Sequence, residues 1–204
     1  FYNCTGLTGE LVIPDNVETI DAYVFYSCSG ITNLVIGENV GAISANAFKG
    51  CSGLTSITMP VSAYPTASTT FSGCTKVSSV TLTKGTGRGH NYNSTTYGYT
   101  PWYLSRNNSN GITVTIEDGI TSIGDYTFYY CSGLTGELVI PDSVETIGRL
   151  AFYKCSKLTS VTIGNNVTSI GEGASHSCTG LTGAFVILDG VKSIGDSAFY
   201  LCGK

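Results

Sequence analysis

The sequence predicts a repeat solenoid, a right-handed superhelix with a parallel β-sheet on one face and short strands and turns, or short helical turns, on the other. Three observations predict it. Eight cysteines recur along the 204 residues, and six of the seven intervals between them are 23 or 24 residues long. The segments between the cysteines share one pattern, and residues 4–28 and 131–155 are nearly copies of one another. Such a period is typical of solenoids, whose repeats bury their apolar faces only against their neighbours.

Each repeat opens with a short strand, as the alternation of apolar and polar residues in 158–163 (LTSVTI) indicates. The column predicted to face inward is apolar throughout: Leu11, Leu34, Ile57, Val80, Val114, Leu138, Val161 and Phe185. The neighbouring outward column is β-branched, as an exposed pleated face prefers: Val12, Val35, Thr58, Thr81, Thr115, Val139, Thr162 and Val186. Stacking these strands gives a parallel sheet with a rise of ~4.8 Å per repeat.

After the strand, a proline such as Pro141 or a glycine such as Gly164 ends the ladder, and a second apolar pair follows. The residue after that pair is glycine in four repeats, at Gly124, Gly148, Gly171 and Gly195, and we expect it to adopt a positive φ. The return leg carries an aromatic ring three residues before most cysteines. Ser175 replaces that ring in one repeat, so His176 or a neighbouring repeat fills the space, or a small cavity remains.

The cysteines are Cys4, Cys28, Cys51, Cys74, Cys131, Cys155, Cys178 and Cys202. Equivalent side chains on successive repeats lie about 5 Å apart and point the same way, whereas a disulfide needs Cβ atoms about 3.8 Å apart that face each other. We therefore expect a structural ladder of free thiols that act as small hydrophobes. No repeat offers a CxxC pair and the two histidines are far apart, so we expect no metal site.

The repeat unit resembles that of the BspA-like leucine-rich repeats, which runs roughly as LxxVxIPxxVTSIGxxAFxxC. This resemblance implies a leucine-rich-repeat-like solenoid. It also implies a place in a long surface or secreted protein, since members of the family are typically such proteins of bacteria and some parasitic protists. Several of its members are implicated in adhesion to host proteins or to other microbes. We therefore expect an extracellular or cell-surface location, with any signal and anchor outside these residues.

The cysteine pattern divides one solenoid over residues 1–204 into a first block of repeats at 1–83, an irregular insertion at 84–111 and a second block at 112–204. The insertion is rich in glycine and asparagine, as loops are, and it suggests two alternatives: a cap in which Trp102 packs over the next repeat, or a binding loop. The two alternatives are compatible with each other, because one segment can serve both as a cap and as a binding loop. The candidate ligand-binding residues are Arg88, Tyr92, Tyr97, Tyr99, Trp102, Tyr103 and Arg106 in the insertion, with Thr58, Thr81 and Thr115 on the outward strand face.

Composition and charge argue against several classes of function for this chain. The net charge is -4 with ten scattered basic residues, so no positive stripe is available for nucleic acid or an anionic membrane surface. No apolar stretch approaches the roughly 18 to 20 residues of a membrane span. Acidic residues recur as copies without a base beside them, so we expect neither an enzyme nor a cofactor. Two hypotheses remain: a monomeric adhesion module for a protein or glycan, or a spacer that holds another domain away from the cell.

Overall fold

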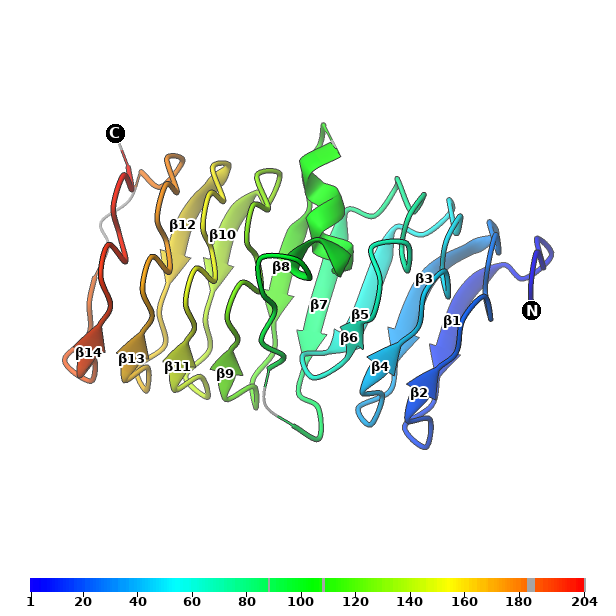
Figure 1. Ribbon diagram of the computed structural model, residues 1–204, viewed down its shortest axis with the longest axis horizontal. Coiled ribbons are helices and arrows are strands. Elements are labelled where there is room, and N and C mark those ends of the chain that lie inside the picture. The colour runs from blue at the N-terminus through cyan, green and yellow to red at the C-terminus, as the bar shows by residue number, and fades with distance from the viewer. Residues whose placement is uncertain (88, 108, 183–185, 204) are drawn as a thin grey trace.

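The computed structural model, which describes residues 1–87, 89–107, 109–182 and 186–203, is an elongated solenoid of stacked repeats. Figure 1 shows the two termini at opposite ends of the stack and a short helical segment at its middle. The predicted solenoid fold is therefore confirmed. Every strand pair is parallel, and one continuous hydrophobic cluster extends from Ile13 to Ala198.

Long strands form one face of the solenoid. The first sheet has the order β1-β3-β5-β7-β8, and the second pairs β10 with β12. Their bounds are β1 (Gly9–Ile13), β3 (Ile31–Ile36), β5 (Ser56–Pro60), β7 (Ser79–Thr83), β8 (Thr113–Ile116), β10 (Gly136–Val139) and β12 (Leu158–Thr162). A single bridge between Ile112 and Leu134 joins the two sheets. In these strands Leu34, Ile57, Val80 and Leu138 are each 1% exposed, as the alternation predicts, while Phe185 lies outside the described residues.

Two-residue strands form a second pair of sheets across the core, with the orders β2-β4-β6 and β14-β13-β11-β9. Their bounds are β2 (Thr19–Ile20), β4 (Ala42–Ile43), β6 (Tyr64–Pro65), β9 (Ser122–Ile123), β11 (Thr146–Ile147), β13 (Ser169–Ile170) and β14 (Ser193–Ile194). The insertion lies between these two sheets. Among the residues described between β6 and β9 no short strand occurs, whereas the long strands β7 and β8 still pair across the insertion.

The return legs consist of turns. Among the described residues, helix is confined to two 3-10 segments of the insertion, η1 (Tyr97–Tyr99) and η2 (Pro101–Asn107). Each of the eight residues that precede a cysteine has a positive φ, from 55° at Ser27 to 86° at Gly73, and only two of them are glycine. The turn is closed by the amide of the cysteine, which donates to the carbonyl three residues earlier, as Cys28 does to Phe25 at 3.2 Å.

The prediction of positive φ at Gly124, Gly148, Gly171 and Gly195 is wrong, since none of them adopts it. The requirement for glycine at these positions is steric. A Cβ added at Gly171 would lie 2.5 Å from the backbone nitrogen of Arg149 and 2.6 Å from the carbonyl carbon of Gly148, both in the preceding repeat. Glycine is therefore needed because two backbones approach closely, which a side chain of any size would prevent.

Phenylalanine rings form a stacked column through the core. Phe25, Phe48 and Phe71 follow one another with ring centroids 5.4 Å apart, and Phe128 stacks on Phe152 at 5.3 Å. At the break in this column, His176 does not replace the missing ring. It lies between Tyr153 and Tyr200 in the outer aromatic column, with ring centroids 5.0 and 4.9 Å away, while Ser175 is buried at the core position.

All eight cysteines are free in this structure, and all but Cys4 and Cys202 are buried. Their thiols also act as hydrogen-bond donors, which the hydrophobe interpretation does not include. Six of them, in Cys28, Cys51, Cys74, Cys155, Cys178 and Cys202, donate to a carbonyl of the preceding repeat with Sγ to oxygen distances of 2.8 to 3.2 Å. The acceptor is always the residue in the phenylalanine column, so each thiol ties two repeats together.

We expect these thiols to make the fold sensitive to alkali. Burial raises the pKa of Cys51 to about 12 and also raises those of Cys74, Cys131 and Cys155. Unfolded thiols titrate near pH 8.5. Stability is therefore fully present below about pH 8.5 and is lost as the pH rises toward the folded pKa values, by about 1.4 kcal/mol per pH unit for each such thiol.

Urea unfolding under reducing conditions at about pH 7.5, 8.5 and 9.5 measures this loss. The variant Cys51→Ala is the control, because it removes one titrating thiol and should show a shallower slope of stability against pH. A free energy of unfolding that stays level across this range would contradict the prediction.

Candidate ligand-binding surfaces

The outward face of the long strands brings three of the predicted residues together. The register pairs Thr58 with Thr81 and Thr81 with Thr115, so the three side chains stand side by side on β5, β7 and β8. Farther along the same face, Val12 is 54% and Val139 51% exposed. This row is uncharged and β-branched, and its shape is set by the regular backbone ladder beneath it.

The insertion buries its largest ring. Trp102 is 2% exposed, its ring centroid lies 5.4 Å from that of Phe128, and its indole nitrogen donates to the Thr127 carbonyl at 2.5 Å. Trp102 thus packs, tilted by 46°, against the end of the phenylalanine column of the second block, which is the packing that the capping alternative requires. Burial removes this side chain from the surface that a ligand can contact.

Tyr92 is buried for a related reason. It is 4% exposed and meets Trp102 edge to face with ring centroids 6.4 Å apart, while its amide donates to the Asp125 carbonyl at 2.9 Å. Desolvation raises the pKa of its hydroxyl well above the ordinary value. Residues 89–92 therefore bridge the gap in the short-strand sheets, and Tyr92 also lies beneath the surface.

The other predicted residues of the insertion divide as follows. Tyr99 and Tyr103 are half-buried, and Arg106 is exposed, donates to the Tyr103 hydroxyl and lies 4.9 Å from the centre of that ring. Arg88 and the side chain of Tyr97 lie outside the described residues. The insertion therefore presents a smaller aromatic surface than its composition suggests.

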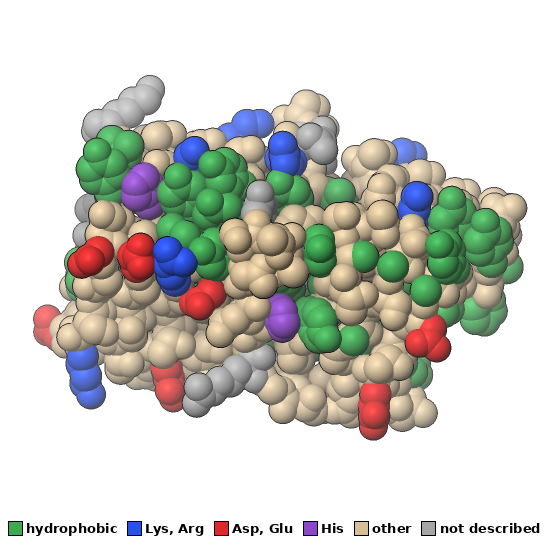
Figure 2. Space-filling view, in the orientation of Figure 1, with side chains coloured by type: hydrophobic (Ala, Val, Ile, Leu, Met, Phe, Trp, Pro, Cys, Tyr) green, Lys and Arg blue, Asp and Glu red, His purple; other side chains and the backbone are tan. Residues whose placement is uncertain are grey.

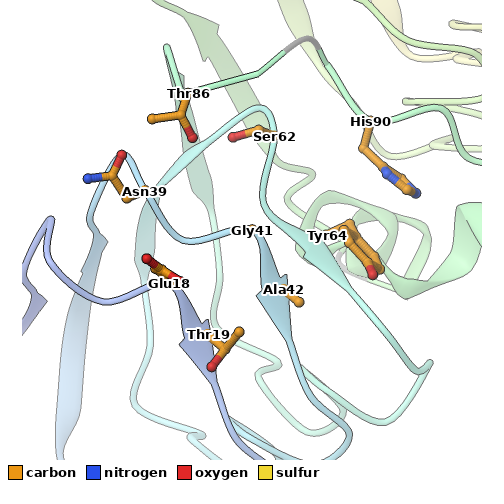
Figure 3. Close-up of a pocket in the computed structure, with 9 residues that line it drawn as sticks. All are labelled: Glu18, Thr19, Asn39, Gly41, Ala42, Ser62, Tyr64, Thr86 and His90. Atoms are coloured by element: carbon orange, nitrogen blue, oxygen red, sulfur yellow. The ribbon is translucent and has the colours of Figure 1, made fainter.

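The sequence analysis missed a groove on the short-strand side, about 580 Å³ in volume, beside Tyr64 and His90. Figure 3 shows Glu18, Asn39 and Thr86 toward one side of it, Gly41 and Ala42 in the middle, and the two rings at the other side. A signal was present in the repeat alignment. Tyr64 is aromatic at a position where the other paired short strands carry Thr19, Ala42, Ser122, Thr146, Ser169 and Ser193.

A second feature that the analysis missed is an aromatic cluster on the return legs of the second block. Tyr129, Tyr153, His176 and Tyr200 follow one another with ring centroids 4.9 to 5.0 Å apart. Lys154 lies 5.3 Å from the Tyr153 ring. Figure 2 shows the whole solenoid from this side, with hydrophobic side chains gathered toward both of its ends and mostly uncharged side chains and backbone between them. Because the rings cover one another, stacking between repeats accounts for this cluster.

Over the described part of the chain, no three His, Cys, Asp or Glu side chains come together in a way that would hold a metal ion. The same residues contain no helix with the length and apolar character needed to cross a bilayer.

The sequence profile of the BspA type leucine rich repeat region matches residues 1–93 and 105–204, in six copies. The chain belongs to the BspA-type leucine-rich repeat family. This match confirms the resemblance inferred from the repeat unit. The gap in the match, residues 94–104, falls within the insertion and includes Trp102. In this BspA-type array, residues 94–104 are thus the part of the insertion that the family pattern does not cover.

A solved structure of a leucine-rich repeat protein shares the fold. A leucine-rich repeat protein from Eubacterium ventriosum is 20% identical, with a TM-score of 0.54 over 96% of this chain and 43% of that one. The pneumococcal vaccine antigen PcpA is 20% identical, with a TM-score of 0.41 over 92% of this chain and 47% of the antigen. The BspA-type chain thus spans less than half the length of either protein. No curated protein matches it.

Proposed function

We propose that this BspA-type array is a non-catalytic binding module of a cell-surface or secreted protein, acts as a monomer and mediates adhesion to a protein or glycan. The observation that carries the proposal is the row of Thr58, Thr81 and Thr115 on adjacent strands, continued by exposed valines. This uncharged row is half-buried at Thr58 and Thr81 and exposed at Thr115, and because a regular backbone ladder holds it, it loses little conformational entropy when a ligand binds. The family membership supports the same function.

Within this proposal the insertion has two roles. Its buried rings, Tyr92 and Trp102, join the two blocks, and its outer residues Tyr99, Tyr103 and Arg106 supply contacts beside the strand face. Aromatic and arginine side chains are common anchors of binding surfaces. Arg88 and Tyr97 remain candidate anchors from the sequence alone.

The test places a charge in the centre of the strand face. Thr81→Lys should weaken binding at least about tenfold, because a long charged side chain displaces a close contact and must be desolvated. The probes are a glycan array and a panel of immobilised extracellular-matrix proteins, read by surface plasmon resonance. Thr146→Lys, the same change on the exposed short-strand side, is the matched control and should leave binding unchanged.

Tyr99→Ala tests the insertion in the same assay and should weaken capture if the outer residues contribute. If Thr81→Lys captures the ligand as well as the unsubstituted chain does, the ligand does not bind at the centre of the strand face. Binding of no probe by the unsubstituted chain would favour the second candidate, a spacer. The near identity of residues 4–28 and 131–155 favours a spacer, because exchangeable repeats make few unique contacts. Deleting whole repeats would then change only the reach of the parent protein.

A further inference from the structure

The groove beside Tyr64 exists because two neighbouring lining positions carry small side chains. Gly41 stands in a column that holds Glu18, Thr121, Glu145, Thr168 and Lys192 in other repeats, and Ala42 stands next to Thr19. A Cβ added at Gly41 would meet no atom closer than the Glu18 carbonyl oxygen at 4.0 Å. The hollow is therefore a local departure from the repeat. Its volume, about 580 Å³, falls in the range of small-molecule sites.

One wall of the groove is a fixed aromatic pair. The rings of Tyr64 and His90 stack with centroids 4.4 Å apart and an angle of 9° between their planes. His90 is held in place by its amide, which donates to the Val61 carbonyl at 3.2 Å, and by edge-on contact with buried Tyr92 at 4.8 Å. The wall is thus supported from the core, and little ordering remains to be done when a ligand binds.

The ring of Tyr64 offers a face to the groove. His90 covers one side of the ring, and the neighbour on the other side in the register is Ala42, whose side chain ends at Cβ. Tyr64 is 36% exposed. An open tyrosine face at the side of a groove suits a flat ligand surface made of C–H groups, because the face of an aromatic ring is electron-rich.

Polar groups lie opposite the ring. The Asn39 amide nitrogen donates to the Asp15 carbonyl at 2.8 Å, which orients the amide, and the Glu18 carboxylate, Thr19 and Thr86 add acceptors and hydroxyls. Burial lowers the pKa of His90, so its ring is neutral at physiological pH. Among the described lining residues Glu18 is the one charged side chain, which disfavours anionic ligands.

We propose that this groove binds a short neutral saccharide, with one sugar ring stacked on Tyr64 and its hydroxyl groups hydrogen-bonded to Glu18, Asn39 and Thr86. Sugars combine a C–H face with hydroxyls that both donate and accept, which is the combination that the two sides of the groove present. This site lies on the short-strand side, separate from the strand face around Thr81, so each site is tested by its own variants.

The experiment uses the whole chain and a panel of neutral trisaccharides with glucose, mannose, galactose and N-acetylglucosamine units. Binding is detected by saturation-transfer NMR and quantified by calorimetry. At least one probe should bind, and Tyr64→Ala should weaken it about tenfold or more, whereas Tyr64→Phe should stay within about threefold. Tyr130→Ala is the matched control, since Tyr130 is also 36% exposed but lies outside the groove.

Gly41→Thr is a second, independent variant. It restores a side chain that other repeats carry in this column, and the space at Gly41 admits it, so folding and the melting temperature should be kept while the groove is filled and saccharide binding is lost. Tyr64→Ala follows the array in the same way, because Ala42 holds that position in the neighbouring repeat.

Two outcomes would overturn the proposal: binding of no saccharide by the unsubstituted chain, or equal binding by Tyr64→Ala and the unsubstituted chain. Loss of binding in Thr81→Lys with Tyr64→Ala unaffected would assign the saccharide to the strand face instead.

Discussion

Replacing Trp102 with alanine is expected to lower the free energy of unfolding by about 3–5 kcal/mol, the range for removal of a large buried ring. The ring is 2% exposed and packs against Phe128, and its indole N–H donates to the Thr127 carbonyl. Its loss leaves both a cavity and an unpaired carbonyl. Urea unfolding followed by far-UV circular dichroism measures the change.

The position of Trp102 adds a second expected effect. The short-strand sheets are interrupted at the insertion, so the two blocks are joined there by the pairing of β7 with β8, by the backbone hydrogen bonds of His90 and Tyr92, and by the aromatic contacts. Repeat arrays unfold in parts when the coupling between neighbours weakens. Trp102→Ala should therefore also broaden the unfolding transition.

Two controls accompany this variant. Trp102→Phe keeps a ring of the kind that the array uses in this column and should lose much less stability. Tyr200→Ala removes a ring that is 57% exposed and should change stability by less than about 0.5 kcal/mol. A loss in Trp102→Ala of under about 1 kcal/mol would show that the ring does not support the second block.

Gly171→Ala is expected to destabilise the protein by about 1–3 kcal/mol, as overpacking does, although alanine is the smallest possible addition. Its Cβ would lie 2.5 Å from the Arg149 nitrogen, so the backbones of two repeats would have to separate. Thermal unfolding monitored by circular dichroism gives the change in stability.

Gly41→Ala is the matched control, because its Cβ meets nothing closer than 4.0 Å and its φ is not positive. It should be neutral or should stabilise the protein by up to about 1 kcal/mol, since alanine restricts the unfolded chain. Equal losses in the two variants would mean that backbone freedom, and not the contact between repeats, explains the glycines.

The spacing of the cysteines was sufficient to predict the solenoid. The resemblance of the repeat unit to a known consensus indicated the family, and the alternation within each strand predicted the side on which its residues lie. These properties recur in every repeat, so each repeat supplies the same evidence for them again. Leu34 and Ile57 are buried and Val12 is exposed, as the alternation requires. The binding surfaces were predicted less accurately than the fold. Tyr92 and Trp102 are buried, and the groove beside Tyr64 was missed.

The sequence by itself determined the period, the inward and outward columns and the stacking of like residues, because each follows from local alternation and from repetition. The tertiary structure alone decided why Gly171 must be glycine, where the rings of the insertion lie and where a hollow opens between Glu18 and Tyr64. The physical reason is that each of these depends on contacts between residues a full repeat or more apart, whose distances composition and spacing do not specify.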